Sequence, residues 1–207
     1  MPARQIDITE LEPALAYKLL VGAVQPRPIA WVSTVGTDGT TNLAPFSFFT
    51  VASRDPATLL VSIGSKADGG VKDTLANVRA TGDFVVNVAS FDHHIAVSTT
   101  GATVAPDVDE FELADLTPIA SDVVRAPRVA EARLAIECRL REEHQIGTDT
   151  VIYGTVLRIH AAEGVLDDTM RVDNDVLNPL GRLAGPWFTG PLMSIPEGWA
   201  PAATVNP

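Results

Sequence analysis

The chain has 207 residues and a formal charge of −11, because 26 Asp and Glu residues outnumber 15 Lys and Arg residues. Its length is that of one domain, and its hydrophobic fraction of 46% is enough for a sizeable core, which excludes a disordered polymer. The acidity excludes nucleic acid and an anionic membrane as main partners, since both attract basic surfaces.

The first ten residues are polar and mixed in charge, without the basic and then apolar segments of a signal peptide. No apolar run in the sequence approaches the ~18 residues of a membrane span. These two features lead us to expect a cytoplasmic protein. Next along the chain, Leu11, Leu15 and Leu19 stand at helical spacing and predict a short first helix.

The part that follows is rich in strand patterns, and the 15 Gly and 15 Pro residues of the chain divide it into short runs. The strands that we expect cover residues 28–35, 41–51, 58–63, 83–89, 131–140 and 150–160. Turns at 36–39 and 54–56 join the first three strands, and Val71, Leu75 and Val78 predict a helix before the fourth. Because most strands are joined by turns, the sequence favours a mainly β (α+β) domain over a doubly wound parallel sheet.

The clearest strand is 131–140, in which apolar and charged residues alternate with a period of two. Cys138 has the apolar phase, so we place it in the core and expect no nucleophile there; a lone cysteine also excludes an internal disulfide. Residues 92–127 carry less strand pattern and predict a helix followed by a long excursion. Prolines recur near the C-terminus, which predicts a domain over 1–190 and an extended, Pro-rich arm over 191–207.

Familiar catalytic and metal motifs are absent from the sequence. Neither G-x-G-x-x-G nor G-x-x-x-x-G-K-[ST] occurs in a phosphate-binding context, and H-E-x-x-H is missing. His93 and His94 are adjacent and diverge in a helix or a strand, so a solvated helix start after Asp92 is favoured and a chelating pair is the alternative. The acidic run 173–175 lacks the glycine of a calcium loop and indicates a polar turn. We therefore predict no metal site and no catalytic triad or carboxylate pair.

The segment 42–49 (N-L-A-P-F-S-F-F) is unusual for a core strand, because Asn42 and Ser47 put polar groups among aromatic ones. Pro45 cannot donate a hydrogen bond to a neighbouring strand. It therefore predicts an edge, a bulge or a place where something other than a strand lies alongside. An ordinary strand with a kink is the alternative.

The segment 62–74 leads from a strand end through a glycine-containing loop into a helix whose first turn holds Lys72 and Thr74. A helix start has free backbone N–H groups and the positive end of the helix dipole. Together with Lys66 and several hydroxyls, these groups predict an anion site in an otherwise acidic chain. In the alternative interpretation, Lys72 is a solvated surface residue and Asp73 a helix-start charge.

Four runs follow one another in a recognisable order: R-P-I-A-W-V-S-T at 27–34, N-L-A-P-F-S-F at 42–48, K-D-T at 72–74 with Asn77, and F-V-V-N at 84–87. In this order they resemble the flavin reductase-like family of FMN-binding split-barrel proteins. Weaker similarity continues at 108–114, 127–138 and 180–185, so the resemblance covers residues 15–190. Its strength lies in the ordered set rather than in any one motif.

The resemblance implies a six-stranded antiparallel split β-barrel of Greek-key type with peripheral helices. It also implies a homodimer that binds FMN, or FAD as the alternative flavin, near the subunit interface. The implied cofactor contacts are Arg27, Trp31, Ser33, Thr34, Ala44, Pro45, Phe46, Ser47, Ser62, Lys66, Lys72 and Thr74.

Within this set the resemblance implies different partners on the flavin. Trp31, Ser33 and Thr34 would lie by the ring and the ribityl chain, and residues 44–47 would line the flavin. The phosphate would be held by Ser62, Lys66, Lys72 and Thr74. Arg27, together with Arg182, would close the site or meet the nicotinamide donor.

The implied activity is transfer of a hydride from NADH or NADPH to N5 of the flavin, which needs stacking geometry but no catalytic acid or base. Reduced flavin or its electrons would pass to a separate acceptor such as a flavin-dependent monooxygenase, a ferric complex or another redox protein. The rival interpretation is an FMN-binding module that relays electrons without oxidising nicotinamide, and an amine oxidase is a more distant one. The stretches 92–101 and 182–187 depart from the family pattern, and we expect both to border the substrate side.

Overall fold

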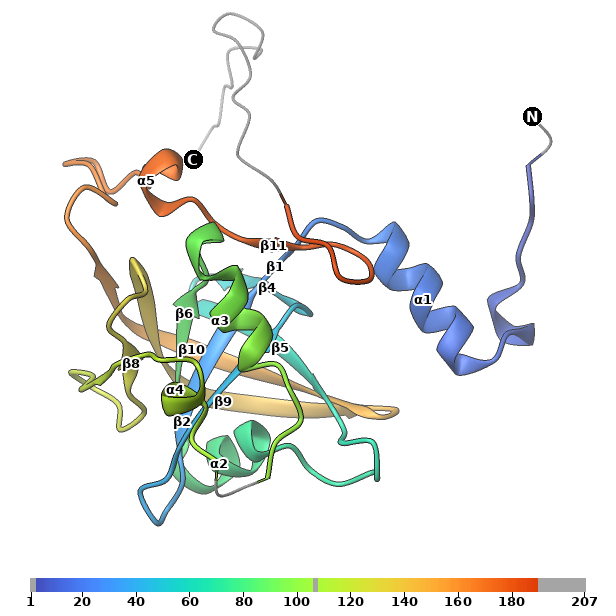
Figure 1. Cartoon of the computed structure of the whole chain (residues 1–207), viewed down its shortest axis with the longest axis horizontal. Coiled ribbons are helices and arrows are strands. Elements are labelled where there is room, and N and C mark those ends of the chain that lie inside the picture. The colour runs from blue at the N-terminus through green and yellow to red at the C-terminus, as the bar shows by residue number, and fades with distance from the viewer. Residues whose placement is uncertain (1–2, 106–107, 190–207) are drawn as a thin grey trace, which may run out of the picture.

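The computed structural model describes residues 3–105 and 108–189, and its central feature is one antiparallel β-sheet (Figure 1). The seven strands of this sheet are β2 (Ala30–Val35), β3 (Thr41–Phe46), β4 (Phe49–Arg54), β5 (Ala57–Gly64), β6 (Asp83–Val88), β9 (Leu134–Ile146) and β10 (Asp149–Ala161). They lie side by side in the order β3-β2-β6-β9-β10-β5-β4. Two short pairs accompany them: β1 (Arg27–Pro28) with β11 (Gly181–Arg182), and β7 (Pro118–Ile119) with β8 (Arg128–Val129). The prediction of a mainly β, antiparallel fold is confirmed.

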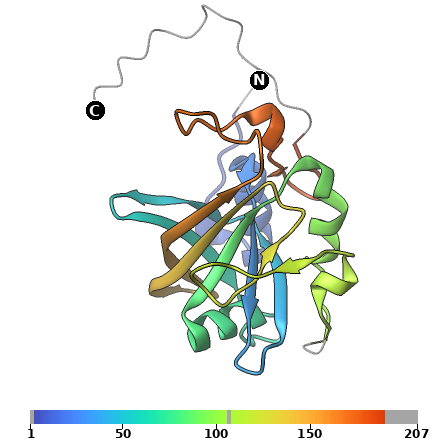
Figure 2. The same cartoon turned by 90° about the vertical axis from the view of Figure 1, so that its left-hand side faces the viewer.

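The two edge strands, β3 and β4, are consecutive in the chain and are separated only by Ser47 and Phe48. Seven strands laid flat would hold the edges about 29 Å apart, at ~4.8 Å per strand. The step from Phe46 to Phe49, however, spans at most ~11 Å. The sheet must therefore curl until its edges approach each other at this corner, and Figure 2 shows the strands wrapped around a common interior.

The number of strands differs from the expected six. Residues 41–51, which the sequence pattern presents as one strand, divide at Ser47 and Phe48 into β3 on one edge and β4 on the other. The six-strand prediction was wrong because a run of strand-forming residues does not show where the chain crosses between edges. Within residues 3–105 and 108–189, no ladder of hydrogen bonds joins β3 to β4, so the curled sheet is open there.

The curled sheet encloses the main hydrophobic core. Val32 of β2, Phe84 of β6 and Cys138 of β9 are fully buried in it. The helix α2 (Asp73–Thr81) adds Leu75 and Val78 to the same core. Burial raises the pKa of the Cys138 thiol to about 12, so the thiolate does not form at neutral pH. The prediction of an inert core cysteine is confirmed.

The helices lie outside the sheet (Figure 1). The helix α1 (Pro13–Ala23) projects away from it, and Val21 is its one buried residue. A second core cluster, which contains Trp31 of β2, is formed with α3 (His94–Thr99) and α4 (Glu110–Leu113). The short elements η1 (Ile8–Glu10), η2 (Phe91–His93) and α5 (Asn174–Leu177) complete the set.

Both predicted helices and the helix expected at the start of residues 92–127 are confirmed, whereas the expected arm over 191–207 lies outside the described residues. His93 and His94 stand at the start of α3, which confirms the predicted helix start, but both are partly buried rather than solvated. Burial is the main reason why the pKa of His93 is lowered. Asp173 begins α5 by accepting two backbone N–H hydrogen bonds, which confirms the polar turn. Among the helices in the described part of the chain, none is long and apolar enough to cross a membrane.

A buried carboxylate holds the loop between β7 and β8 against the sheet. Glu137 of β9 is completely buried and accepts hydrogen bonds from the backbone N–H groups of Asp122 (2.9 Å), Val123 (2.7 Å) and Val124 (3.1 Å), and it also contacts the His160 ring. Burial by itself would raise the pKa of Glu137, but the hydrogen bonds outweigh burial and lower it. This carboxylate therefore stabilises the fold in its ionised form.

Candidate functional site

Two hollows meet at the edge strand β3. The lysine hollow, of about 100 Å³, is lined by Asn42, Ala44, Pro45, Lys66, Lys72, Asp73, Thr74, residues 100–104 and Glu110. The aromatic hollow, of about 420 Å³, is lined by Tyr17, Ile29, Pro45, Ser47, Val97, Ser98, Gly101, Arg182 and Phe188. Pro45 and Gly101 belong to both, so the two hollows adjoin and one ligand can extend from one into the other.

The lysine hollow joins the edge of the sheet to the start of α2. Lys66 Nζ forms an ion pair with Asp73 Oδ1 at 2.9 Å, and both side chains are partly exposed. Lys72, the N-cap residue of α2, has its Nζ 5.6 Å from the centroid of the Phe46 ring, a cation–π distance. The first backbone N–H groups of a helix have no acceptor within the helix. The hollow therefore offers an anion two ammonium groups and a helix start.

Hydroxyl, amide and carboxyl groups complete this wall. Asn42 Nδ2 donates to Thr74 Oγ1 (3.1 Å), which ties β3 to α2 and leaves the Thr74 hydroxyl proton free to donate. Glu110 of α4 accepts from the backbone N–H of Leu43 (3.1 Å), and burial raises the pKa of this carboxyl. A helix side chain thus lies along the edge of β3. Of the three predictions for Pro45, the edge is confirmed, because β3 is the outermost strand of the sheet.

Arg27 organises the aromatic hollow without lining it. Its buried guanidinium donates to the C=O groups of Val21 (2.6 Å) and Val24 (2.7 Å) at the end of α1 and to the C=O of Leu183 (3.4 Å). It also donates from Nε to Ser47 Oγ (3.3 Å). These contacts hold together α1, the segment after β11 and the corner between β3 and β4, which all contribute walls to the hollow.

Six of the twelve predicted cofactor contacts line the two hollows, namely Ala44, Pro45, Ser47, Lys66, Lys72 and Thr74. Three more support the walls from behind. Arg27 contacts Ser47, Phe46 lies under Lys72, and Trp31 donates its Nε1 hydrogen to Thr100 Oγ1 (2.9 Å). The structure brings nine of the twelve to this place, although no more than six of them face the hollows.

Ser33, Thr34 and Ser62 line neither hollow. Ser33 donates its hydroxyl to the C=O of Pro127, and Thr34 Oγ1 accepts from Asn77 Nδ2 (3.1 Å); both residues are fully buried. Ser62 donates its hydroxyl to a carboxylate at the start of β10 (3.3 Å). Their side chains hold β2 and β5 to neighbouring elements, and their flavin contacts stay predictions.

Sequence reasoning missed much of the aromatic hollow. Tyr17 comes from α1 and Phe188 from the segment after β11, and no local pattern connects them. Val97, Ser98, Gly101 and Arg182 belong to the two stretches that we expected to border the substrate side, and the structure brings all four to this hollow.

In the lysine hollow the missed residues are Asn42, Asp73, Glu110 and residues 102–104. Asn42 gave a signal, because it is a polar side chain in an apolar strand. Glu110 gave none, since an acidic residue in an acidic chain is normally solvated. Its burial is decided by the packing of α4 on β3.

Comparisons of sequence place this chain among proteins with a known domain type. The family model described as flavin reductase like domain matches residues 23–181. An uncharacterized protein of Aquifex aeolicus is 40% identical over 181 residues, which cover 87% of this chain and 92% of that protein. An FMN reductase (NADH) of Agrobacterium fabrum is 29% identical over 141 residues, which cover 66% of this chain and 76% of that protein.

Comparisons of structure agree with this placement. Nitrilotriacetate monooxygenase component B from Bacillus cereus superposes with a TM-score of 0.88 at 34% identity, covering 94% of this chain and 100% of that one. A protein of Shewanella frigidimarina, described as a flavin reductase with a split barrel domain, superposes with a TM-score of 0.79 at 19% identity, covering 91% and 95% of the two chains. The second likeness concerns the fold alone, and it shows that the curled, open sheet is a split barrel.

Proposed function

Because this chain belongs to the flavin reductase-like family of FMN-binding split barrels, we propose that it binds FMN and transfers a hydride to it from NADH or NADPH. Reduced flavin or its electrons then pass to a separate acceptor such as a monooxygenase. The names of two similar proteins, an FMN reductase (NADH) and a monooxygenase component, support this choice.

The observation that carries the proposal is that two ammonium groups and a helix start meet in the lysine hollow, beside the Asp73 and Glu110 carboxyls that also line it. Lys66 and Lys72, two of the three lysines in a chain of formal charge −11, both line it. A phosphate monoester placed there would receive both ammonium groups, the hydroxyl of Thr74 and N–H groups at the start of α2. These donors fit the phosphate that distinguishes FMN from riboflavin.

The residues of the chain have distinct tasks in this proposal. FMN, when bound, supplies the atom that accepts the hydride and releases the electrons. The lysine hollow binds the phosphate, and Pro45 and Gly101, which both hollows share, orient the flavin toward the aromatic hollow. Tyr17 and Phe188 provide apolar walls that exclude water beside the nicotinamide.

The decisive test is spectroscopic. The purified protein should take up FMN and show the visible absorption of an oxidised flavin. Anaerobic addition of NADH or NADPH should then bleach this absorption, because the hydride reduces the flavin. A protein that binds neither FMN nor FAD would contradict the proposal. One that stays yellow with both nicotinamides would favour the electron-relay alternative.

We also propose that the protein is a homodimer, and α1 supports this. The helix has 11 residues. Leu15 and Leu20 within it are 48% and 56% exposed, and Val24 directly after it is 61% exposed. Isolated helices shorter than ~12 residues are marginal in water. A second copy of the chain that covers this apolar surface would stabilise the projecting helix of Figure 1.

Sedimentation should therefore give twice the mass of one chain, and Leu20→Glu should shift the protein toward the monomer because a charge would be buried at the interface. The control is Met170→Glu, which makes the same change at a 77% exposed residue away from α1. A wild-type monomer with bound flavin would contradict the dimer but not the reductase.

A further inference from the structure

The aromatic hollow contains one charged side chain. Of the nine residues that line it, Arg182 alone carries a charge, and the others are apolar, aromatic or hydroxylic. The Arg182 guanidinium carbon lies 4.9 Å from the centroid of the Phe188 ring, in a cation–π arrangement. An arginine on the wall of an otherwise uncharged hollow is a candidate for ligand recognition.

The backbone fixes both members of this pair. Arg182 is paired with Arg27 between β11 and β1, and it forms an isolated bridge with Phe188 on its other side. Hydrogen bonds from the N–H of Thr189 to the C=O of Gly181 (2.9 Å) and from the N–H of Gly181 to Thr189 Oγ1 (2.8 Å) close the same turn. The guanidinium and the ring are therefore held side by side before any ligand arrives.

The chemistry of the guanidinium indicates what it binds. Arginine stays protonated at every relevant pH and presents a planar fork of N–H donors that matches a carboxylate or phosphate. Among residues 3–105 and 108–189, no carboxylate lies within ion-pair distance of Arg182. Nearby, Ser47 Oγ accepts from Arg27, so its own proton can be donated into the hollow.

We propose that Arg182 is the specificity-determining residue of the aromatic hollow, and that the molecule bound there carries an acid group beside a flat apolar ring. The proposal rests on the proposed function, because it assigns the second substrate of the flavin site. The acid group has two possible sources: the pyrophosphate of a nicotinamide dinucleotide, or the carboxylate of an aromatic electron acceptor. Both would use the same fork of donors.

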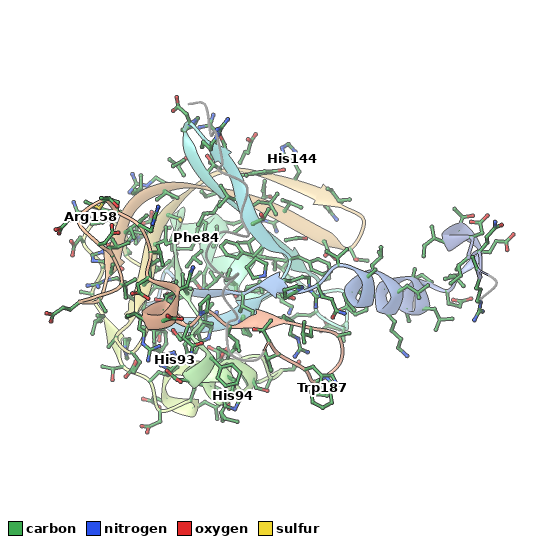
Figure 3. The ribbon with its side chains drawn as sticks, turned by 90° about the horizontal axis from the view of Figure 1, so that it is seen from above. Phe84, His93, His94, His144, Arg158 and Trp187 are labelled. Atoms are coloured by element: carbon green, nitrogen blue, oxygen red, sulfur yellow. The ribbon has the colours of Figure 1, made fainter. Side chains whose placement is uncertain are left out.

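The variants that test this are Arg182→Leu, Arg182→Lys and the control Arg158→Leu. Leucine can pack on Phe188 in place of the guanidinium, and the pairing of β11 with β1 uses only backbone groups, so the fold should persist. Arg158 is 47% exposed in its ion pair with Asp122, and its removal changes the net charge equally. In Figure 3 it lies on the other side of the molecule from Trp187, which follows β11.

Calorimetric titration of the flavin-loaded protein measures the binding of three unreactive probes: NAD⁺, 1-naphthoate and the uncharged 1-naphthylmethanol. Arg182→Leu should raise the Kd of NAD⁺ or of naphthoate by about 10- to 100-fold, the loss of a charge-assisted hydrogen bond pair. It should leave naphthylmethanol within about twofold, and Arg182→Lys should fall between. Weakening of NAD⁺ alone assigns the acid group to the dinucleotide, and weakening of naphthoate alone assigns it to an organic acid.

A kinetic pair separates recognition from reactivity. If the dinucleotide is the ligand, Arg182→Leu should raise the concentration of NADH that gives half-maximal flavin bleaching. The corresponding concentration of 1-benzyl-1,4-dihydronicotinamide, an uncharged hydride donor, should not change. Unchanged Kd values for both charged probes, or an equal loss for the uncharged one, would overturn the role of Arg182. If neither donor bleaches the wild-type flavin while naphthoate binding still depends on Arg182, the reductase proposal fails and the acid-binding site stands.

Discussion

Replacing Lys72 by alanine is expected to weaken FMN binding by roughly 10- to 100-fold and to leave riboflavin binding almost unchanged. An ammonium group that donates to a charged acceptor contributes about 1.5–3 kcal/mol, and 1.4 kcal/mol is a factor of ten in affinity. Riboflavin lacks the phosphate, so its affinity should not depend on the charge of Lys72. Fluorescence titration of the protein with both flavins measures the two affinities.

Arg158→Ala is the control, because it removes the same charge from an exposed ion pair with Asp122 rather than from the lysine hollow. Lys66→Ala should weaken FMN at least as much as Lys72→Ala, since it also leaves the Asp73 carboxylate unpaired beside the phosphate. Adding Asp73→Asn to Lys66→Ala should recover part of that loss. Equal weakening of FMN and riboflavin by Lys72→Ala would show that the phosphate is bound elsewhere.

Replacing Glu137 by alanine should lower the free energy of unfolding by about 3 kcal/mol or more. The substitution leaves three backbone N–H groups of the loop at 122–124 without their acceptor, and each buried, unsatisfied donor costs about 1–3 kcal/mol. Glu137→Gln should lose most of the same stability, because its NH₂ group would face N–H donors. Urea unfolding measures the difference.

The control for this change is Glu142→Ala in the same strand, where the side chain is 53% exposed and its ion pair with Arg141 is long, at 3.9 Å. An exposed pair of this kind contributes at most about 1 kcal/mol. If Glu137→Ala were as stable as Glu142→Ala, the loop would not depend on the buried carboxylate.

The Glu137 carboxylate should also make the stability of the protein depend on pH. The pKa of Glu137 is lowered in the folded protein from its ordinary value of 4.5, so its contribution to stability is complete above about pH 4.5 and is lost as the pH falls through the lower, folded value. Wild-type stability should therefore decline below that pH, and the decline should be smaller in Glu137→Gln, which has no proton to bind there. Urea titrations repeated between neutral and acid pH measure both slopes.

Several parts of the fold could be predicted because they depend on residues close together in the chain. The alternation over 131–140 predicted a strand, which runs from Leu134 to Ile146, and the buried phase of Cys138. It was wrong for Glu137, which has the charged phase but is completely buried because the backbone N–H groups of the loop at 122–124 donate to it. The turn at 36–39 forms as expected, with the N–H of Gly36 donating to the C=O of Thr40 (2.8 Å). The lysines and Thr74 at the start of α2 could be assigned to one site because a single loop and helix turn position them.

Other parts of the site could not be predicted from neighbouring residues in the sequence. On β2, Trp31 and Thr34 are paired with Pro45 and Asn42 of β3, which line the hollows. Their own side chains are covered by helices instead: Trp31 by α3 and α4, and Thr34 by α2. Arg27 was assigned to the cofactor by resemblance, whereas its hydrogen bonds join three segments behind the hollow wall. A residue type at a strand position does not specify which long-range neighbour reaches it first.

The sequence by itself determined most strand and turn positions, the buried cysteine and the two lysines near the start of α2, since each follows from spacing within a few residues. Only the tertiary structure decided that 41–51 spans two edges of one sheet and that Tyr17, Arg182 and Phe188 share a hollow with Pro45. The physical reason is the curl of the sheet. It results from packing summed over the whole core, and it brings together residues that no local pattern relates.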